Sequence, residues 1–271
     1  MTASLDQIVA ATRRRVADAK RSVDLRRLER EGEQHVRRGF RRALAGQTGP
    51  AIIAELKKAS PSRGLIRANF DPEGLAEELE AAGATALSVL TDEEFFQGSL
   101  ANLQRASART QLPCLQKDFV VDEFQLLQAR AHGADAVLLI VAVLSPAELI
   151  ALGKKSRELG LDVLCEAHSE EELRRVLETG CDLVGVNNRD LRTFKVDVNT
   201  ALRLAEMIPK NVVSVAESGI DSGADVSRLR AAGYRAFLIG ESLMKTESPG
   251  EALKTLLAEA EREGSALSRQ D

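Results

Sequence analysis

The sequence predicts an α/β fold made of one (β/α)8 barrel with an N-terminal helical extension. After residue 50 a unit recurs eight times: an apolar strand, a polar loop, an amphipathic helix and a turn of small residues. The strands are nearly continuous in Val, Ile, Leu and Ala, which is typical of parallel strands covered by helices. The length of 271 residues suits one TIM barrel of about 250 residues. A doubly wound sheet is the alternative, but no GxGxxG turn follows the first strand.

The eight strands are expected at 51–57, 85–90, 113–117, 136–141, 162–167, 183–187, 212–217 and 236–240. Helix starts lie between them. Asp71 and Ser145 each precede a proline at the first helical position, and Glu148 completes a capping box with Ser145. Ser169 and the glutamates at 170–172 predict another capping box. Helices end at AAG (81–83), AHGAD (131–135), ETGCD (178–182) and AAGY (231–234), where glycine favours a C-terminal cap.

The two ends of the chain complete the predicted architecture. Residues 1–50 are expected to form a helical extension packed on the barrel, and the last helix is expected at Pro249–Glu263. Residues 264–271 are expected to be a frayed tail. Since no linker or shift in composition interrupts the chain, residues 1–271 are predicted to form a single barrel domain.

Composition narrows the class of protein. A hydrophobic content of 44% with 29% charged residues is ordinary for a globular enzyme. The longest apolar run, 136–144, is too short to span a bilayer, and the polar, basic N-terminus has no signal-peptide core. Cys114, Cys165 and Cys181 form no CxxC pair, which fits a reducing compartment. We therefore expect a cytoplasmic protein without a membrane partner.

Charge is unevenly distributed. The net charge is −4, but residues 1–50 carry 12 Lys/Arg against 6 Asp/Glu. The favoured interpretation is an amphipathic, solvated extension that lies across the barrel, which is compatible with a basic flap near an anionic substrate. A nucleic-acid arm is the alternative, but aromatic residues are nearly absent there and no binding motif is present. No nucleic-acid partner is expected.

Charged side chains end several strands that should be apolar. Glu55 and Lys57 end the first strand on the same face, Lys117 ends the third and Glu166 the fifth. Burial of an unpaired charge is costly, and the active site of such a barrel lies at the C-terminal ends of its strands. The sixth and seventh strands add Asn187, Arg189, Glu217 and Ser218. These groups predict a cluster of separate general acids and bases, with a ring of purely structural salt bridges as the alternative.

A phosphate site is expected beside this cluster. The loops AESGI (216–220) and LIGESLM (238–244) follow strands 7 and 8, where barrels commonly hold a substrate phosphate. Their small residues let backbone N–H groups approach an anion at the start of a short helix near Glu241. The SPSRG loop with Ser60 can close on it.

Other candidates carry weaker expectations. The spacing of Cys114 and Cys165 from Lys117 and Glu166 turns both thiols toward the helices. His168 has the same parity as Glu166 but lies at the start of the next helix, where it is expected to cap that helix or lie behind the reacting groups, with catalysis as the alternative. His35 and His132 are expected on helix surfaces. Apolar walls for a flat ring are offered by Leu90, Phe96 and Leu138, although ordinary core packing explains them equally well. No spacing resembles a metal site or a nucleophile elbow, so neither metal nor cofactor is expected.

The chain resembles the indole-3-glycerol phosphate synthase family over about residues 5–262. The resemblance lies in eight ordered segments: IIAELKKASPSRG, ALSVLTDEEFFQGSL, CLQKDF, ADAVLLIVAVL, LCEAHSEEEL, GVNNRDLRTF, AESGI and LIGESLM. It implies a monofunctional lyase of tryptophan biosynthesis. The implied reaction closes the ring of 1-(2-carboxyphenylamino)-1-deoxyribulose 5-phosphate, with loss of CO2 and water, to give indole-3-glycerol phosphate.

The resemblance also implies roles. Lys117 is similar to the acid that protonates the sugar ketone, Glu166 to the base of the dehydration, and Lys57 to the partner of the substrate carboxylate. Glu55, Asn187 and Glu217 would orient these groups and bind the ribulose hydroxyls or the anthranilate. Phosphate contacts are implied for Ser60, Ser218, Gly219, Gly240 and Glu241, and Arg189 also matches the motif.

Three other functions are possible for a barrel of this kind. A phosphoribosylanthranilate isomerase is associated with a cysteine on strand 1 and an aspartate on strand 6, where this chain has Lys57 and Asn187. A Schiff-base aldolase would use Lys117 or Lys57. A barrel that binds a phosphorylated metabolite without catalysis would have no need of the full acid–base set. The expected partner is a small phosphorylated substrate, and the expected assembly a monomer or weak homodimer.

Overall fold

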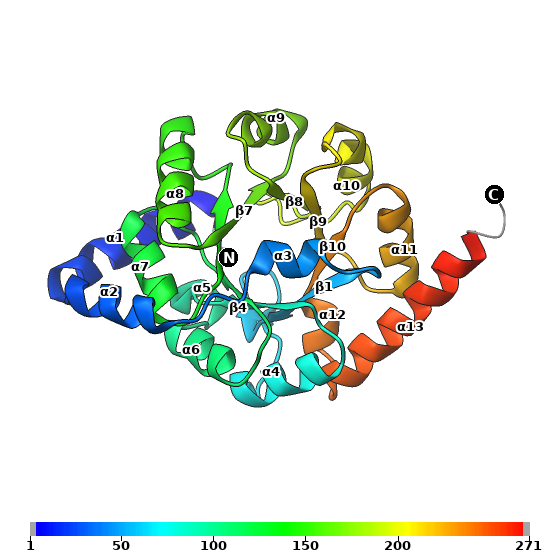
Figure 1. Cartoon of the computed structure of the whole chain (residues 1–271), viewed down its shortest axis with the longest axis horizontal. Coiled ribbons are helices and arrows are strands. Elements are labelled where there is room, and N and C mark those ends of the chain that lie inside the picture. Colours follow the sequence, from blue (N-terminus) through cyan, green and yellow to red (C-terminus); the bar gives the residue numbers. More distant parts are fainter. Residues whose placement is uncertain (1–3, 268–271) are drawn as a thin grey trace.

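Eight parallel strands close into a barrel in the computed structural model, which describes residues 4–267 (Figure 1). The strands are β1 (Ala51–Leu56), β4 (Ala86–Leu90), β5 (Cys114–Lys117), β6 (Ala136–Ile140), β7 (Asp162–Ala167), β8 (Leu183–Asn187), β9 (Val213–Glu217) and β10 (Ala236–Ile239). They follow one another around the barrel, and β10 pairs with β1 to close it. The predicted fold class is confirmed, with each strand end within one residue of its predicted position.

Helices form a ring outside the strands (Figure 1). They are α4 (Pro72–Ala81), α6 (Leu100–Ala108), α7 (Glu123–Ala131), α8 (Pro146–Glu158), α9 (Glu170–Glu178), α10 (Asn199–Leu204), α11 (Gly223–Ala231) and α13 (Pro249–Leu267), and a 3-10 turn spans Ala205–Met207. Asp71 caps α4, and Ser145 with Glu148 forms the predicted capping box. The last helix extends four residues past its predicted end, so the expected tail keeps helical backbone to Leu267, and residues 268–271 lie outside the described part.

Apolar side chains fill two separate regions because side chains alternate along each strand. One set, including Ile53, Leu115 and Leu164, packs inside the barrel. The other packs between strands and helices and includes Cys114 and Cys165. The prediction that both thiols face the helices is therefore confirmed.

The N-terminal extension spans the height of the barrel. It consists of α1 (Leu5–Ser22), α2 (Leu25–Gln34) and α3 (Phe40–Ala45). Helix α3 lies across the middle of the molecule in Figure 1 and buries Phe40 and Leu44 among the first residues of the strands, such as Ala51. Helix α2 packs along α7, and α1 places Ile8 against Phe119, just after β5. The extension therefore contacts both ends of the barrel.

The positive charge of the extension is matched by acidic side chains of the barrel. Arg13 pairs with Glu148 at 3.2 Å, and Lys20 pairs with Asp122 at 2.9 Å. Arg41 Nε lies 2.8 Å from an Asp182 carboxylate oxygen. Part of the positive charge of the extension is thus paired with acidic side chains of the barrel.

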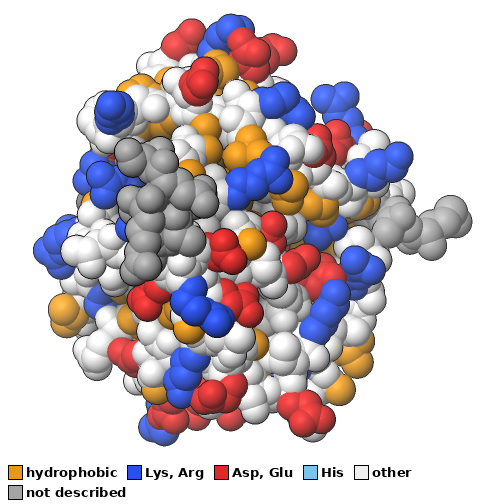
Figure 2. All heavy atoms as spheres, turned by 90° about the vertical axis from the view of Figure 1, so that its right-hand side faces the viewer, with side chains coloured by type: hydrophobic (Ala, Val, Ile, Leu, Met, Phe, Trp, Pro, Cys, Tyr) orange, Lys and Arg blue, Asp and Glu red, His pale blue; other side chains and the backbone are white. Residues whose placement is uncertain are grey.

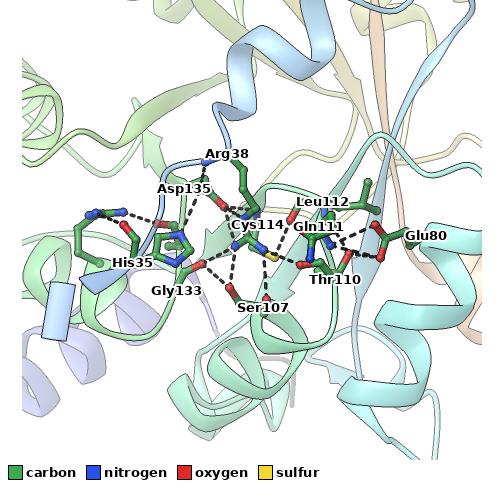
Figure 3. Close-up of polar contacts among 12 residues, drawn as sticks. His35, Arg38, Glu80, Ser107, Thr110, Gln111, Leu112, Cys114, Gly133 and Asp135 are labelled. Atoms are coloured by element: carbon green, nitrogen blue, oxygen red, sulfur yellow. Dashed lines mark hydrogen bonds and ion pairs between the residues drawn. The ribbon is translucent and has the colours of Figure 1, made fainter. Parts of the chain in front are cut away.

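Arg38 makes the most extensive of these contacts (Figure 3). Its guanidinium donates to the buried carboxylate of Asp135, with Nε–Oδ2 at 2.9 Å, to Ser107 Oγ and to the backbone carbonyls of residues 107, 110 and 133. The ring of His35 lies 3.1 Å from the other Asp135 oxygen. The prediction that His35 is a helix-surface residue is wrong, because the chain turns after α2 and carries the ring inward to Asp135. His132 lies at the C-cap of α7, half-buried, with Nδ1 2.8 Å from Gln128 O.

Short elements lie in the loops at the C-terminal ends of the strands. A short hairpin, with two residues in each strand, pairs β2 (Ala59–Ser60) with β3 (Gly64–Leu65). Helix α5 (Glu93–Phe96) follows β4. Helix α12 (Glu241–Met244) begins where the short helix after β10 was predicted. On the face shown in Figure 2, charges of both signs are interspersed and hydrophobic side chains form only small groups. Within residues 4–267 no helix is long and apolar enough to cross a membrane.

Candidate active site

A cavity of about 310 Å3 opens at the C-terminal ends of the strands. Its volume is in the range typical of small-molecule sites. The structure brings all of the sequence-predicted site residues to its wall: Glu55, Lys57, Ser60, Phe96, Lys117, Leu138, Glu166, Asn187, Arg189, Glu217, Ser218, Gly219, Gly240 and Glu241.

Lys117 lies at the centre of the charged cluster. Its Nζ is 2.9 Å from Glu166 Oε2 on β7 and 3.3 Å from Glu217 Oε2 on β9, so carboxylates of two strands share one ammonium. Both carboxylates are 1% exposed. Because one cation cannot fully compensate two buried anions, the three groups must titrate together.

The shared ammonium separates the two carboxyl groups chemically. Burial raises the pKa of Glu217 well above its usual value, and this effect exceeds the opposing attraction of Lys117. Burial also acts on Glu166, but the charges of Lys117 and His168 outweigh it and hold the pKa of Glu166 far below its usual value. Burial disfavours the charged form of Lys117, yet Glu166 and Glu217 raise its pKa overall. At neutral pH the site therefore holds a charged ammonium group, Lys117, beside an ionised carboxylate, Glu166.

Glu55 and Lys57 form a second charged pair on the first strand. Lys57 Nζ lies 2.5 Å from Glu55 Oε1, and Glu55 is 4% exposed. Their shared face agrees with the alternation predicted for β1. Gly240, after β10, passes so close that an added Cβ would lie 2.5 Å from Glu55 Oε1. A side chain at residue 240 would therefore displace this pair.

His168 lies between Glu166 and the start of α9. Its Nε2 is 3.3 Å from Glu166 Oε1, and Nδ1 is 3.1 Å from Glu172 Oε2. Glu172 also accepts the backbone N–H of His168 at 2.7 Å. Ser169 caps α9 as expected, but the predicted capping box is wrong, because Glu172 is turned to His168 and not to the N-cap N–H.

At the ends of β8 and β9, backbone contacts and backbone conformation position the polar residues of the site. Asn187 Oδ1 accepts the N–H of Arg189 at 2.9 Å, and Asn187 lies beside Glu217 in the register of the two strands. Ser218 follows with a φ of 66°, a left-handed conformation that is strained for a residue with a side chain. Gly219 has a φ of 70°, and an added Cβ would lie 2.5 Å from a methyl carbon of Val196.

Cations gather at the predicted phosphate site. The carboxylate of Glu241 is contacted by Arg63 at 3.0 Å, Lys245 at 2.5 Å and Arg189 at 3.6 Å. Burial acts against the lowered pKa of Glu241, but Lys245, Arg63 and Lys57 together outweigh it. Ser60 Oγ lies 3.5 Å from Ser62 Oγ in the turn between β2 and β3. Sequence reasoning did not single out Arg63 and Lys245, because each lies in a surface loop or short helix with an ordinary charged composition.

Apolar side chains also line the cavity. They include Leu90, Phe96 and Leu138, as the sequence suggested, together with Phe119 and Ile8 of α1. The rings of Phe96 and Phe119 are tilted, with centroids 6.4 Å apart. Such a surface suits a flat aromatic group placed against the charged wall.

Three charged residues at this end of the barrel were not found by sequence reasoning. Arg15 of α1 pairs with Asp92 at 2.8 Å and with Asp118 at 3.1 Å, and both aspartates line the cavity. Asp118 follows Lys117 directly, so the QKDF segment was the available signal. In residues 4–267, no group of three or more His, Cys, Asp or Glu side chains is placed to hold a metal ion.

Comparisons with known proteins were consistent with this geometry. Residues 5–256 match the family model described as indole-3-glycerol phosphate synthase. An indole-3-glycerol phosphate synthase of Koribacter versatilis is 54% identical, covering 95% of this chain and 100% of the relative. The synthase of Rhodopirellula baltica is 49% identical over 94% and 98% of the two chains.

Solved structures show the same fold at lower similarity. A mandelate oxidase mutant superposes with a TM-score of 0.64 at 17% identity, covering 80% of this chain and 74% of that one. A thiamine phosphate pyrophosphorylase of Pyrococcus furiosus has a TM-score of 0.59 at 16% identity, covering 79% and 96%.

Proposed function

Since the chain belongs to the indole-3-glycerol phosphate synthase family and has that carboxy-lyase activity of tryptophan biosynthesis, we propose how its residues carry out the reaction. The substrate is 1-(2-carboxyphenylamino)-1-deoxyribulose 5-phosphate. Its aromatic ring lies against Phe96 and Leu138, and its phosphate lies at the loops after β9 and β10. The observation that carries this proposal is the position of Lys117 between an ionised and a raised-pKa carboxyl group.

Ring closure requires an acid. As the aromatic carbon attacks the ketone, the developing alkoxide takes a proton from Lys117, whose ammonium is the most buried cation of the site. Lys57 pairs with the substrate carboxylate until CO2 leaves and the aromatic ring is restored. Placing both ammonium groups before reaction stabilises charge as it develops, without reorganisation of water.

Dehydration requires a base and an acid. Glu166 removes a proton from the ring-closed intermediate while Lys57 gives a proton to the departing hydroxyl, which leaves as water. Lys57 regains its proton from solvent, because loss of CO2 from a carboxylate consumes one proton overall. Glu55 holds Lys57 at 2.5 Å, and Glu217 holds Lys117 at 3.3 Å. Asn187 binds the ribulose hydroxyls. Lys117 can recover its proton from Glu166, because the two groups are 2.9 Å apart.

The phosphate is bound mainly by backbone. Gly219, Gly240 and Glu241 supply N–H groups, and Ser60 and Ser218 supply hydroxyls. Arg189, together with Arg63 and Lys245, neutralises the phosphate charge, since these cations already surround the Glu241 carboxylate. Such convergence of N–H groups and cations suits a dianion.

Assembly and location follow from surface and composition. The large exposed hydrophobic residues among those described are spread along the chain, in helices, a short strand and loops: Leu25, Val36, Leu65, Ile150 and Val196. Dispersed residues of this kind favour a monomer or weak homodimer over a large apolar interface. Three unpaired cysteines suit a reducing compartment, so we place the enzyme in the cytoplasm as a single barrel domain.

The test is the appearance of indole fluorescence when purified protein meets the substrate. The chain contains no Trp, so its own emission does not mask the product. We expect turnover in the wild type, a loss of at least 10²-fold in Lys117→Ala, and no change in Lys154→Ala, an exposed lysine of α8. Binding of substrate by the wild type without turnover would instead support a barrel that only binds its metabolite.

A further inference from the structure

The two oxygens of Glu166 have different partners. Oε2 lies against Lys117 at 2.9 Å, and Oε1 faces His168 Nε2 at 3.3 Å. We propose that His168, held in place by Glu172, is a positioning residue that keeps Oε1 of Glu166 engaged and so makes Oε2 the oxygen that accepts the proton. This inference rests on the proposed role of Glu166 as the base of the dehydration.

Glu172 fixes the histidine ring. A single carboxylate oxygen, Oε2, accepts the backbone N–H of His168 at 2.7 Å and faces ring Nδ1 at 3.1 Å. Glu172 is itself fixed, because its own backbone N–H donates to Ser169 Oγ at the start of α9. Glu172 is at the third position of the helix, where a capping box would turn its carboxylate to the N-cap N–H. Here the carboxylate contacts the imidazole instead. Main chain, helix start and imidazole form one unit.

A ring between two carboxylates is held in its doubly protonated form. Burial opposes the charged form, but the contacts with Glu166 and Glu172 raise the pKa of His168 to about 10. Nε2 faces Glu166 Oε1 without an aligned hydrogen bond, so the contact is mainly electrostatic. An imidazolium is therefore present beside Glu166 throughout the neutral range.

Substrate binding changes the balance around Glu166. Lys117 must leave Oε2 to reach the substrate ketone, whereas His168 lies outside the reacting centre and can stay on Oε1. Glu166 then keeps one cation in place of two, so its pKa rises and it becomes a stronger base when it is needed. Its free oxygen is the one that faced Lys117, and hence the cavity.

The charged groups around this unit are few. Lys117 of β5 and Glu217 of β9 face Glu166 from the barrel, and Glu55 of β1 acts on Lys117 from further away. Glu166 and Glu172 face the imidazole. Removal of the imidazolium should therefore change the titration of Glu166 in a way that loss of packing alone would not.

The test compares the pH dependence of kcat for His168→Gln, Glu172→Gln and a matched control, His132→Gln at the C-cap of α7. In His168→Gln we expect kcat to fall about tenfold, a part of what a positioned base contributes. The acid limb, which reports Glu166 in the substrate complex, should move up by about one pH unit. In Glu172→Gln the acid limb should stay in place, because His168 is still charged at acid pH. The control should match the wild type.

A second readout needs no activity. The chain has three histidines, so ¹⁵N resonances of the imidazoles can be assigned with the two histidine variants. His168 should remain an imidazolium well above pH 8 in the wild type and lose its proton at lower pH in Glu172→Gln. Titration of wild-type His168 near its ordinary value, or an unmoved acid limb in His168→Gln, would overturn the inference. Absence of turnover in the wild type would instead refute the proposed function, while the resonances still report the contact.

Discussion

Arg15 Nη2 of the N-terminal helix lies 3.1 Å from Oδ1 of Asp118, the residue that directly follows Lys117. The other nitrogen of the guanidinium reaches Asp92, and Asp118 also accepts the hydroxyl of Thr91 at 2.7 Å. Burial raises the pKa of Asp118 despite the attraction of Arg15, which shows how much this carboxylate depends on its partner. The extension is thereby joined to the strand end that carries Lys117.

Arg15→Ala should lower both stability and activity. It leaves two buried aspartates without their cation, at a cost of about 2 kcal/mol in the free energy of unfolding after allowance for the partial exposure of Arg15. Because Asp118 then shifts beside Lys117, kcat should fall by about tenfold. Urea unfolding and steady-state kinetics measure these effects, with Arg14→Ala, an exposed neighbour, as control. Equal behaviour of the two variants would show that the ion pair does not position β5.

Glu217→Gln should make stability less dependent on pH. The folded-state pKa of Glu217 is raised to about 8 from 4.5, so between these values the folded protein keeps a proton that the unfolded chain has released. Stability from this group is therefore present below about pH 4.5 and is lost as pH rises to about 8. The amide is neutral at every pH and can replace the protonated carboxyl group.

Thermal unfolding at two pH values checks this sign. We compare the free energy of unfolding of Glu217→Gln with that of the wild type at each pH. This difference should favour the variant by about 1–3 kcal/mol more at pH 8.5 than at pH 5.5. Glu171→Gln, at an exposed position of α9, should show no such difference. A larger relative gain at pH 5.5 would mean that Glu217 is ionised in the folded protein at neutral pH.

Arg38→Ala should destabilise the fold and leave kcat nearly unchanged. The side chain lies at the end of the barrel opposite the cavity, and its loss leaves Asp135 with only the ring of His35 and backbone N–H groups (Figure 3). We expect a loss of about 3 kcal/mol, with kcat at 25 °C within twofold of the wild type. Chemical denaturation and kinetics measure both, and the exposed Arg37→Ala serves as control. A large drop in kcat of the folded variant would contradict the prediction.

Gly240→Ala should impair substrate binding. The added Cβ would lie 2.9 Å from Glu55 Cβ and closer still to its carboxylate, so either Glu55 or the loop after β10 must shift. Since both Lys57 and the phosphate loop depend on this contact, KM should rise about tenfold or more. The control is Gly264→Ala, where an added Cβ meets open space. A KM unchanged in Gly240→Ala would show that the phosphate is held elsewhere.

The sequence predicted the barrel well for a physical reason. Strands buried on both faces read as continuous apolar runs, and helix caps such as Asp71 mark the boundaries between them. The charged cluster was found by the same logic, because Glu55, Lys117 and Glu166 interrupt runs that burial should keep apolar. Placement of these residues around one cavity followed from the topology.

The features that could not be predicted depend on contacts that leave no pattern in the neighbouring sequence. Arg15 and Asp118 are 103 residues apart, and neither segment has a sequence pattern that indicates its partner. The hairpin of β2 and β3 has two residues in each strand, too few to show a period. Glu172 satisfied the rule for a capping box, but a nearby imidazole competed for its carboxylate.

Because the N-terminal extension contacts both ends of the barrel, the order of folding is constrained. These helices are synthesised before the barrel, yet their partners lie 77 to 121 residues later in the chain: Asp92, Asp118, Asp135 and Asp162. Helix α3 contacts β1, β4 and β9, so its site is complete only after early and late strands of the barrel have come together. Helix α3 is therefore made before the strands that complete its site, and its docking reports that the barrel has closed.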